Sequence, residues 1–418
     1  MRSQKVLGYL LVGMAYLSFA GYAANAAEEP PLFKFDLHGI VGTSLYVQSN
    51  PSQVLNGQGP LLLTTENATS GQSTTGFDLR QTRLRFSVSG PQVLGGATTH
   101  GVVESDFFNL EGPGGYGEIN LMNRLRIAYA ELNWGDTSIR FGQDWELLFN
   151  EFPTSLGHMA FPVTYFAGLS GWRGAGVTFF HKYGISETSN LEGAIQVLRS
   201  DWEAPYDFGR STSNQLNVSA GQLSALPGLE GRLKWTSGKD FVYLAGHWSQ
   251  VDGTKVSALI YPGVAGADVN PISTSRKWDV LEGKVGGKVT FSDFTLQGDF
   301  YVGKNTAPLI GEELQWYTAN DVHEVGGWAQ LGYNFTKTLS IWGVYGTSRS
   351  NEDQVRSAGG GRFANTVAGG MLMYREGPFG IGPEFYHIET KSTKASGAGA
   401  PDGVMDGNQF MFSGMLFF

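Results

Sequence analysis

The sequence contains no cysteine, which excludes disulfides, iron–sulfur clusters and zinc–thiolate sites. Basic residues are also scarce: 29 Lys and Arg stand against 38 Asp and Glu, and the formal net charge is −9. Nucleic-acid binding needs a basic surface, so we expect no nucleic-acid partner. The seven histidines are scattered without the spacing of metal ligands, and we expect neither a metal nor another cofactor.

Long apolar runs are missing except near the N-terminus. There, an apolar stretch over 6–20 follows two basic residues and precedes Ala24-Asn25-Ala26, a pattern typical of a secretory signal peptide. We predict that residues 1–26 are removed and that 27–418 form a single domain. Removal of the two basic residues leaves 27 against 38 acidic ones, a net charge of −11. No later stretch is apolar enough for a membrane-crossing helix, so a membrane-embedded mature chain must cross with strands.

Glycine and aromatic residues are abundant, with 59 glycines and 13% Phe, Trp and Tyr. This composition suits strands with one apolar face and one polar face. The segment Asn408–Phe418 is the clearest example. Its residues Phe410, Phe412, Leu416 and Phe418 are separated by even numbers of positions, so they share one face of a strand. Its terminal aromatic resembles the strand signal by which outer-membrane barrels are handed to their assembly machinery. We therefore expect that machinery to be a partner, acting through the Phe418 strand.

Alternating segments of this kind recur along the whole chain, and each is consistent with a half-buried strand. We predict sixteen of them: 33–48, 77–89, 97–108, 122–133, 137–144, 173–182, 190–199, 229–237, 240–250, 276–291, 293–303, 322–335, 337–348, 362–375, 379–389 and 408–418. No repeat of about 40 residues occurs, which argues against a β-propeller.

The connectors alternate between long and short. The long ones are 49–76, 109–121, 145–172, 200–228, 251–275, 304–321, 349–361 and 390–407, and the intervening ones are tight turns. Long loops at one end and short turns at the other are typical of outer-membrane barrels. The predicted fold is therefore all-β, a transmembrane antiparallel β-barrel of 16 strands, with 14 and 18 as alternatives. Loops 49–76 and 394–407 are polar and glycine-rich, and we expect them to face solvent.

Between positions 80 and 173 the chain has seven arginines and no lysine. Apolar residues alternate with several of them and would face lipid: Leu84, Phe86 and Val88 in one segment, and Leu125, Ile127 and Tyr129 in another. This register points Arg83, Arg85, Arg124, Arg126 and Arg140 into the lumen. The inward direction is favoured because an arginine on the lipid face near the bilayer midplane costs about 2–4 kcal/mol.

These arginines have two interpretations. They could be structural and pair with lumenal acids such as Glu104 and Asp106, which share one face of their segment. They could also form a basic ladder that faces acids across a constriction, which would create a transverse field and favour anionic solutes. The guanidinium fork suits either role, because it grips a carboxylate or phosphate at two points. Both interpretations can hold together.

The connector 145–172 differs from the other long loops because it is rich in bulky apolar residues. A loop in solvent would not carry so many, so it must pack either inside the barrel or against a neighbouring subunit. We favour the inside, where it would narrow the pore. Asp144, Glu146 and Glu151 could then face the arginines.

Three motifs resemble DcaP-like porins of Gram-negative bacteria: Glu104-Ser-Asp-Phe-Phe, Leu125-Arg-Ile-Ala-Tyr-Ala-Glu and Phe141-Gly-Gln-Asp-Trp. More loosely they resemble the general and phosphate-selective porins. The resemblance implies a 16-stranded barrel, a homotrimer, an inward-folded third loop and passage of small anions such as dicarboxylates. It also implies that Arg124, Arg126 and Arg140 are pore arginines. The segment Asp144–Phe149 is more acidic and apolar than the family pattern, which affects the expected solute.

We therefore predict a passive outer-membrane channel for small hydrophilic solutes, with outer-membrane lipid and lipopolysaccharide as its surroundings and no enzymatic activity. The pore-lining candidates are Arg83, Arg85, Glu104, Asp106, Arg124, Arg126, Arg140, Asp144, Glu146 and Glu151. Two other functions stay open. One is a plugged structural or adhesive barrel. The other is an enzyme on a barrel scaffold, for which we find no aligned Ser/His or Asp/His cluster.

Overall fold

The computed structural model describes residues 33–52, 55–63, 71–113, 119–199, 221, 224–252, 254, 276–311, 319–394 and 403–418. The predicted signal peptide, residues 1–26, lies outside this part of the chain. Residues 34–418 form one compact unit. Among the described residues, no helix has the length and apolar character needed to cross a membrane.

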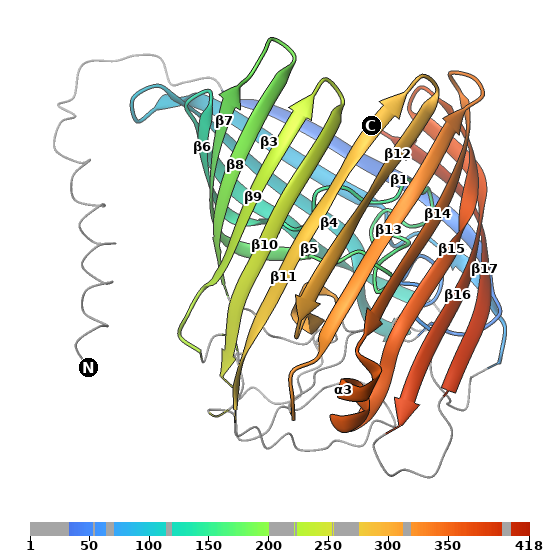
Figure 1. Ribbon diagram of the computed structural model, residues 1–418. Helices are drawn as coiled ribbons and strands as arrows, with labels where there is room; N and C mark the ends of the chain where they lie inside the picture. The colour runs from blue at the N-terminus through green and yellow to red at the C-terminus, as the bar shows by residue number, and fades with distance from the viewer. Residues whose placement is uncertain are drawn as a thin grey trace. The chain divides into compact units, whose positions relative to one another are not determined.

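The unit is a closed antiparallel β-barrel (Figure 1). Its strands are β1 (Lys34–Gln48), β2 (Thr74–Asp78), β3 (Arg83–Val93), β4 (Ala97–Pro113), β5 (Ile119–Asn133), β6 (Thr137–Trp145), β7 (Arg173–Gly184), β8 (Ser189–Leu198), β9 (Gly228–Ser237), β10 (Asp240–Asp252), β11 (Lys277–Phe291), β12 (Phe294–Lys304), β13 (His323–Asn334), β14 (Leu339–Ser350), β15 (Gly360–Glu376), β16 (Phe379–Lys394) and β17 (Gly403–Phe417). Both β2 and β3 pair with β1, at its two ends, so together they make one interrupted barrel strand. The barrel therefore has sixteen strands, and the predicted fold class is confirmed.

The barrel closes where β1 pairs with β17, from Ile40 opposite Phe417 to Gln48 opposite Gln409. The predicted pairing of the last strand with the first is confirmed. Along β17 the predicted alternation also holds. Phe410, Phe412 and Leu416 are exposed on the outer face, whereas the intervening side chains are buried on the inner face. Exposed apolar residues of this kind recur on the outside of the other strands, which is the surface a barrel presents to lipid.

The register of β5 differs from the prediction because of a β-bulge. Leu125 and Ile127 pair with consecutive residues of β4, so Arg126 is an extra residue that has no partner opposite it. Beyond the bulge the alternation reverses: Ile127 is buried, and the Tyr129 ring lies 4.1 Å below the Arg140 guanidinium. The prediction that Ile127 and Tyr129 face lipid is therefore wrong. Leu125 is exposed as predicted, and Arg126 points inward as predicted.

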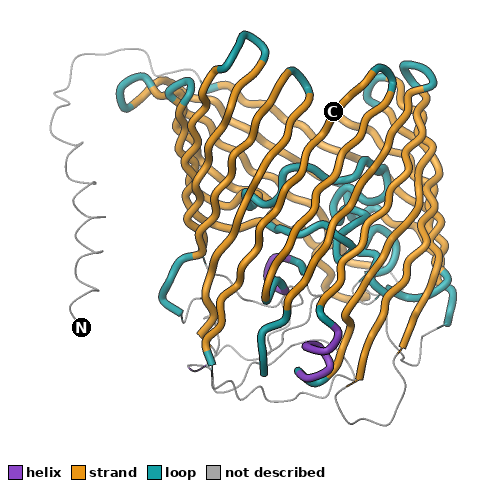
Figure 2. Tube along the Cα trace, in the orientation of Figure 1, coloured by secondary structure: helices purple, strands orange, loops and turns teal. Residues whose placement is uncertain are grey.

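The short connectors lie together at one end of the barrel (Figure 2). Gly238 and Gly377 adopt positive φ values of 58° and 54° in two of them, a conformation that glycine tolerates without strain. The long connectors include two short helices, η3 (Ala307–Leu309) and α3 (Glu352–Ser357). Short periplasmic turns and long extracellular loops are the usual arrangement of such barrels.

Two of the long connectors fold into the barrel. The connector between β6 and β7, residues 146–172, is here called the inner loop, and Figure 2 shows it inside the ring of strands. A part of the first long connector, residues 55–63, packs beside it. One apolar cluster joins both connectors to the wall: Leu62, Phe108, Phe149, Ala160, Phe161, Tyr165, Phe166, Leu169, Ile310 and Trp328.

The expectation that loop 49–76 faces solvent is wrong for its middle part. Leu61, Leu62 and Leu63 are each at most 1% exposed. The Leu61 carbonyl accepts a hydrogen bond from the Asn365 side chain, and the Leu63 N–H donates to Thr390 Oγ1. Three consecutive leucines bury enough apolar surface to draw the segment inward. Most of loop 394–407 lies outside the described residues.

Candidate functional site

The inner loop is held by glutamates of the barrel wall. On β16, Glu384 accepts hydrogen bonds from the N–H groups of Leu156 and Gly157 at 2.7 and 2.6 Å. Its other oxygen accepts from Ser155 Oγ and from Tyr386 Oη. A buried carboxylate with four donors is fully satisfied, so it fixes this part of the loop firmly.

Two further wall strands hold the ends of the inner loop. On β9, Glu230 accepts from the N–H of Leu147 at 2.5 Å. On β11, Glu282 accepts from Ser170 Oγ, and Lys284 Nζ donates to the Ser170 carbonyl at 2.7 Å. The loop therefore leaves β6 and returns to β7 along the wall formed by β9 and β11.

Two amide side chains hold the middle of the inner loop on other strands. Gln330 on β13 accepts from the N–H of Thr154 at 2.7 Å, and Gln409 on β17 lies 2.7 Å from His158 Nε2. Together with the glutamates, these contacts extend from β9 to β17. A loop that touches so many wall strands must cross the lumen.

The acids predicted on β4 bind arginines of the neighbouring strands. Asp106 receives a two-point interaction from Arg124, with N···O distances of 2.9 and 2.7 Å. Arg126 bridges both acids, at 2.7 Å from Glu104 Oε1 and 2.6 Å from Asp106 Oδ2. Arg85 lies 3.2 Å from Glu104 Oε2.

The arginines of this group differ in exposure. The side chain of Arg126 is 1% exposed and that of Arg124 is 14% exposed, because the inner loop covers them; the Phe161 and Trp172 rings lie 5.1 and 5.9 Å from the Arg124 guanidinium. Arg83 is also largely covered and donates to the Met159 carbonyl of the loop. Arg85 is 37% exposed and is the member of the group most accessible to a solute.

Arg140 on β6 forms a separate group with Glu131 on β5 and Asp144 on its own strand. It lines a polar pocket of 270 Å³ together with Lys182, Glu192 and other residues of β5 to β9. Each of these side chains is partly exposed, so the pocket is open to the lumen.

Several charged residues of this region were not predicted from the sequence. Arg232 on β9 binds Glu192 on β8 and Asn150 of the inner loop, each at 2.6 Å. Lys182 on β7 lies 3.9 Å from Glu192. The alternation of Arg232 with Leu233, which is exposed on the outer face, is the signal that could have identified them.

The acids predicted beside the arginines have different neighbours. Asp144 pairs with Arg140, whereas Glu151 in the first part of the inner loop pairs with Lys288 on β11 at 3.5 Å. Glu146 forms no ion pair with an arginine of the described residues; its Oε2 accepts from the N–H of Trp172, which closes the base of the inner loop. Burial, together with the negative charge of the neighbouring Glu230, raises the pKa of Glu146 to about 7.

The raised pKa of Glu146 predicts a pH dependence of stability. A carboxyl whose folded pKa exceeds its unfolded value stabilises the fold when protonated, and this contribution is lost as the pH rises from about 4.5 through about 7. We expect the melting temperature of the barrel in detergent to fall between pH 5 and pH 8, and to fall less in Glu146→Gln. An equal fall in both proteins would contradict the role of Glu146.

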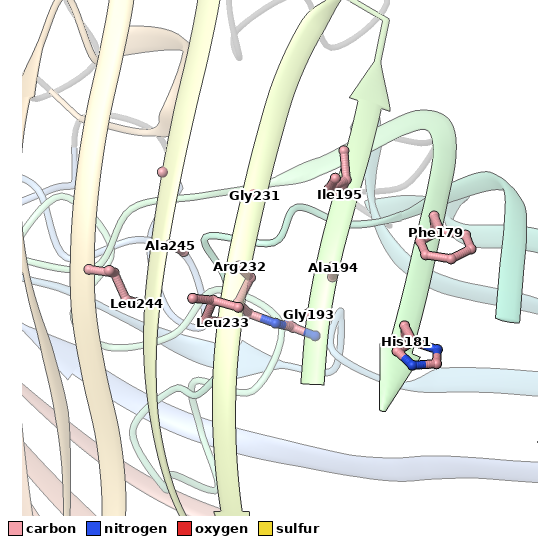
Figure 3. Close-up of a pocket in the computed structure, with 11 residues that line it drawn as sticks. Phe179, His181, Gly193, Ala194, Ile195, Gly231, Arg232, Leu233, Leu244 and Ala245 are labelled. Atoms are coloured by element: carbon pink, nitrogen blue, oxygen red, sulfur yellow. The ribbon is translucent and has the colours of Figure 1, made fainter. Parts of the chain in front are cut away.

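A hollow of 610 Å³ opens on the outer surface and does not belong to this site. Figure 3 shows Phe179, Ile195, Leu233 and Leu244 around it, on β7 to β10. These four side chains are exposed, and glycines on β8, β9 and β10 leave the space between them. Its lining is apolar, as expected for a surface in contact with lipid.

Solved structures share this fold. The outer membrane channel DcaP of Acinetobacter baumannii matches with a TM-score of 0.65 at 14% identity, over 96% of this chain and all of that chain. The anion-selective porin of Comamonas acidovorans gives a TM-score of 0.54 at 11% identity over 93% of this chain and 100% of that one. In-vitro folded OmpT of Vibrio cholerae in its trimer form gives 0.55 at 12% identity, over 92% and 99%.

No protein-family model matches the sequence, and no curated protein matches it either. The fold is that of Gram-negative outer-membrane porins, so the expected DcaP-like barrel is confirmed at the level of the fold. This architecture and its apolar outer face fit the expected location in the outer membrane.

Proposed function

We propose that this chain forms a passive, water-filled channel through which small hydrophilic solutes diffuse, with a preference for anions such as dicarboxylates. A barrel of sixteen strands is wide enough to enclose an aqueous channel. The charged pocket beside Arg140 supports this proposal, because its polar lining opens to the lumen. The proposal involves no covalent chemistry and no cofactor.

The preference for anions rests on one observation: in most lumenal ion pairs the cation is the more exposed partner. The side-chain exposures are 37% and 7% for Arg85 and Glu104, 23% and 12% for Arg140 and Glu131, 55% and 15% for Lys182 and Glu192, and 31% and 20% for Lys288 and Glu151. The exceptions are the pair of Arg232 with Glu192, at 12% and 15%, and the pair of Arg126 with Glu104, at 1% and 7%; near the long loops, Asp321 is also more exposed than its partners Arg276 and Lys304. A passing solute therefore meets mainly positive groups.

We also propose that the inner loop makes the narrow part of the channel. Its residues Asn150 and Glu151 reach Arg232 and Lys288 on opposite sides of β10. The wall beside this contact carries Arg140, Lys182 and Arg232 around one pocket. Several cations along one wall suit a solute with two carboxylates, which can interact with two of them in turn.

Planar-bilayer recordings in a salt gradient test the proposal. We expect stepwise currents and a reversal potential shifted toward the equilibrium potential of the anion. A shift toward the equilibrium potential of the cation would contradict the anion preference, and the absence of any current would contradict the channel itself.

Neutralising the most exposed lumenal cation should reduce the selectivity. A unit charge about 4 Å from an ion in water contributes about 1 kcal/mol, so Lys182→Gln should lower the anion-to-cation permeability ratio by up to about fivefold. Lys391→Gln is the matched control, because Lys391 lies at the other end of the barrel wall and pairs with Glu389. Equal ratios in the unmodified channel and Lys182→Gln would exclude Lys182 from the solute path.

One observation favours the alternative of a plugged barrel. The inner loop, residues 55–63 and Ile310 after η3 meet in a common apolar cluster, which fills part of the lumen. A plugged barrel would give no current in the recordings above.

We further propose a homotrimer surrounded by outer-membrane lipid and lipopolysaccharide. The trimer form of OmpT, which shares the fold, supports this proposal. Mass measurement of the detergent-solubilised protein tests it, and a monomer mass would contradict it.

A further inference from the structure

Arg173 is a buried cation that forms no ion pair within the described part of the chain. It is the first residue of β7 and is 8% exposed. Its guanidinium lies 4.2 Å from the Trp172 ring and 5.0 Å from the Trp145 ring. Among the described residues its side chain makes no ion pair or hydrogen bond, and its buried Nη1 has no partner.

The same two tryptophans contact two other arginines. Arg126 lies 5.7 Å from the Trp145 ring, and Arg124 lies 5.9 Å from the Trp172 ring. The three guanidinium groups therefore surround the same two rings beneath the inner loop. Arg124 also has a buried Nη1 without a partner within the described part of the chain.

The positive charges of this region exceed the negative ones. Among the described residues, five arginines share two carboxylates: Arg83, Arg85, Arg124, Arg126 and Arg173 with Glu104 and Asp106. Arg85 is 37% exposed to the lumen, so the buried excess is two charges, four arginines less two carboxylates. Glu146, which accepts a hydrogen bond from the N–H of Trp172, would reduce this excess to one if it were ionised.

A buried excess of positive charge requires compensation. Arginine stays protonated in proteins, so the region cannot become neutral by losing protons. Leaving a buried cation unpaired strongly destabilises the fold. Stacking on tryptophan offsets part of this cost but does not supply a negative charge or satisfy the free N–H groups.

We propose that a small inorganic anion, of the size of chloride, is held beneath the inner loop between Arg124 and Arg173. The unpartnered Nη1 groups of these two residues donate to it. It is a resident ion that fixes the inner loop to the wall, and it is separate from the solute path along Arg85, Arg140 and Lys182, which are more exposed.

Bromide provides a direct test, because its anomalous scattering locates it in a crystal. We expect a bromide peak in contact with the Arg173 guanidinium when the intact barrel is crystallised with bromide in place of chloride. Bromide found only at exposed lysines and arginines would overturn the proposal.

Thermal stability provides a test in solution. At constant ionic strength and pH, replacing gluconate with chloride should raise the melting temperature of the barrel by a few degrees, because an anion that binds only the folded state stabilises it. Arg173→Gln should abolish this rise. Arg375→Gln should retain it, because Arg375 also stacks on an aromatic ring but is exposed.

Equal melting temperatures in the two salts would overturn the proposal, as would an undiminished rise in Arg173→Gln. Repeating the series with phosphate distinguishes a spherical anion from an oxyanion. These results are independent of the channel proposal, since they are measured on stability and in crystals, whereas the channel is tested by its current.

Discussion

Replacing Glu384 with alanine is expected to release the middle of the inner loop and to destabilise the barrel by about 2–5 kcal/mol. The substitution leaves the N–H groups of Leu156 and Gly157 and the hydroxyl of Ser155 without their acceptor. Equilibrium unfolding in urea measures the loss of stability. In bilayer recordings the released loop should increase the current noise and the mean conductance.

Glu389→Ala is the matched control for this experiment. Glu389 is on the same strand, β16, but it is partly exposed, and among the described residues its ion pair is with Lys391. Exposed pairs contribute little, so this variant should stay within about 1 kcal/mol of the unmodified chain. Similar stabilities for Glu384→Ala and Glu389→Ala would show that Glu384 does not hold the inner loop.

Deletion of Phe418 is expected to reduce the amount of folded barrel strongly while leaving the conductance of the folded fraction unchanged. Phe418 closes the seam: its carbonyl accepts from the N–H of Gly39 at 2.8 Å, and its N–H donates to the Gly39 carbonyl at 3.1 Å. Each lost hydrogen bond costs about 0.5–1.5 kcal/mol. The loss falls on the first and last strands, whose pairing completes the barrel.

Heat-modifiable migration on gels measures the folded fraction of the Phe418 deletion, and bilayer recordings measure its conductance. Phe412→Ala is the control, because Phe412 is an outward aromatic of the same strand with similar exposure but lies away from the strand end. If the deletion and the control fold equally well, the seam at Gly39 is not what limits folding.

Much of the barrel could be predicted from the sequence, because each strand carries its own signal. Along β12 the outer residues are mostly apolar and the inner ones polar, and β17 has an apolar outer face with the same period from Phe410 onward; such a pattern requires only local information. Connector lengths then indicate which ends of the strands meet. The pairing of β1 with β17 follows from closure, since a barrel leaves no edge unpaired.

The bulge at Arg126 could not be predicted, because it depends on how two strands pair. A single extra residue reverses the alternation for the rest of β5, so that Tyr129 lies beneath Arg140. The sequence of β5 alone is equally compatible with both registers. The inward direction of Arg126 was nevertheless predicted, because the bulge begins at that residue.

The contacts of the inner loop also could not be predicted. Its apolar residues indicated that it packs against something, but its partners Glu230, Glu282 and Glu384 lie far away in the sequence on three strands. Residues Leu61–Leu63 lie within an otherwise polar segment, so the sequence predicts that they face solvent. The sequence indicates that arginines can pair with Glu104 and Asp106. The burial of these arginines depends on the inner loop that covers them.

The position of these partners also determines when the lumen is filled. The contacts of Leu156 with Glu384 and of His158 with Gln409 join residues 228 and 251 positions apart, and both partners belong to the last two strands. The inner loop can therefore settle only after β16 and β17 have arrived. Contacts of such long range form late in folding. We therefore expect the inner loop to fill the lumen only after the seam between β1 and β17 has closed.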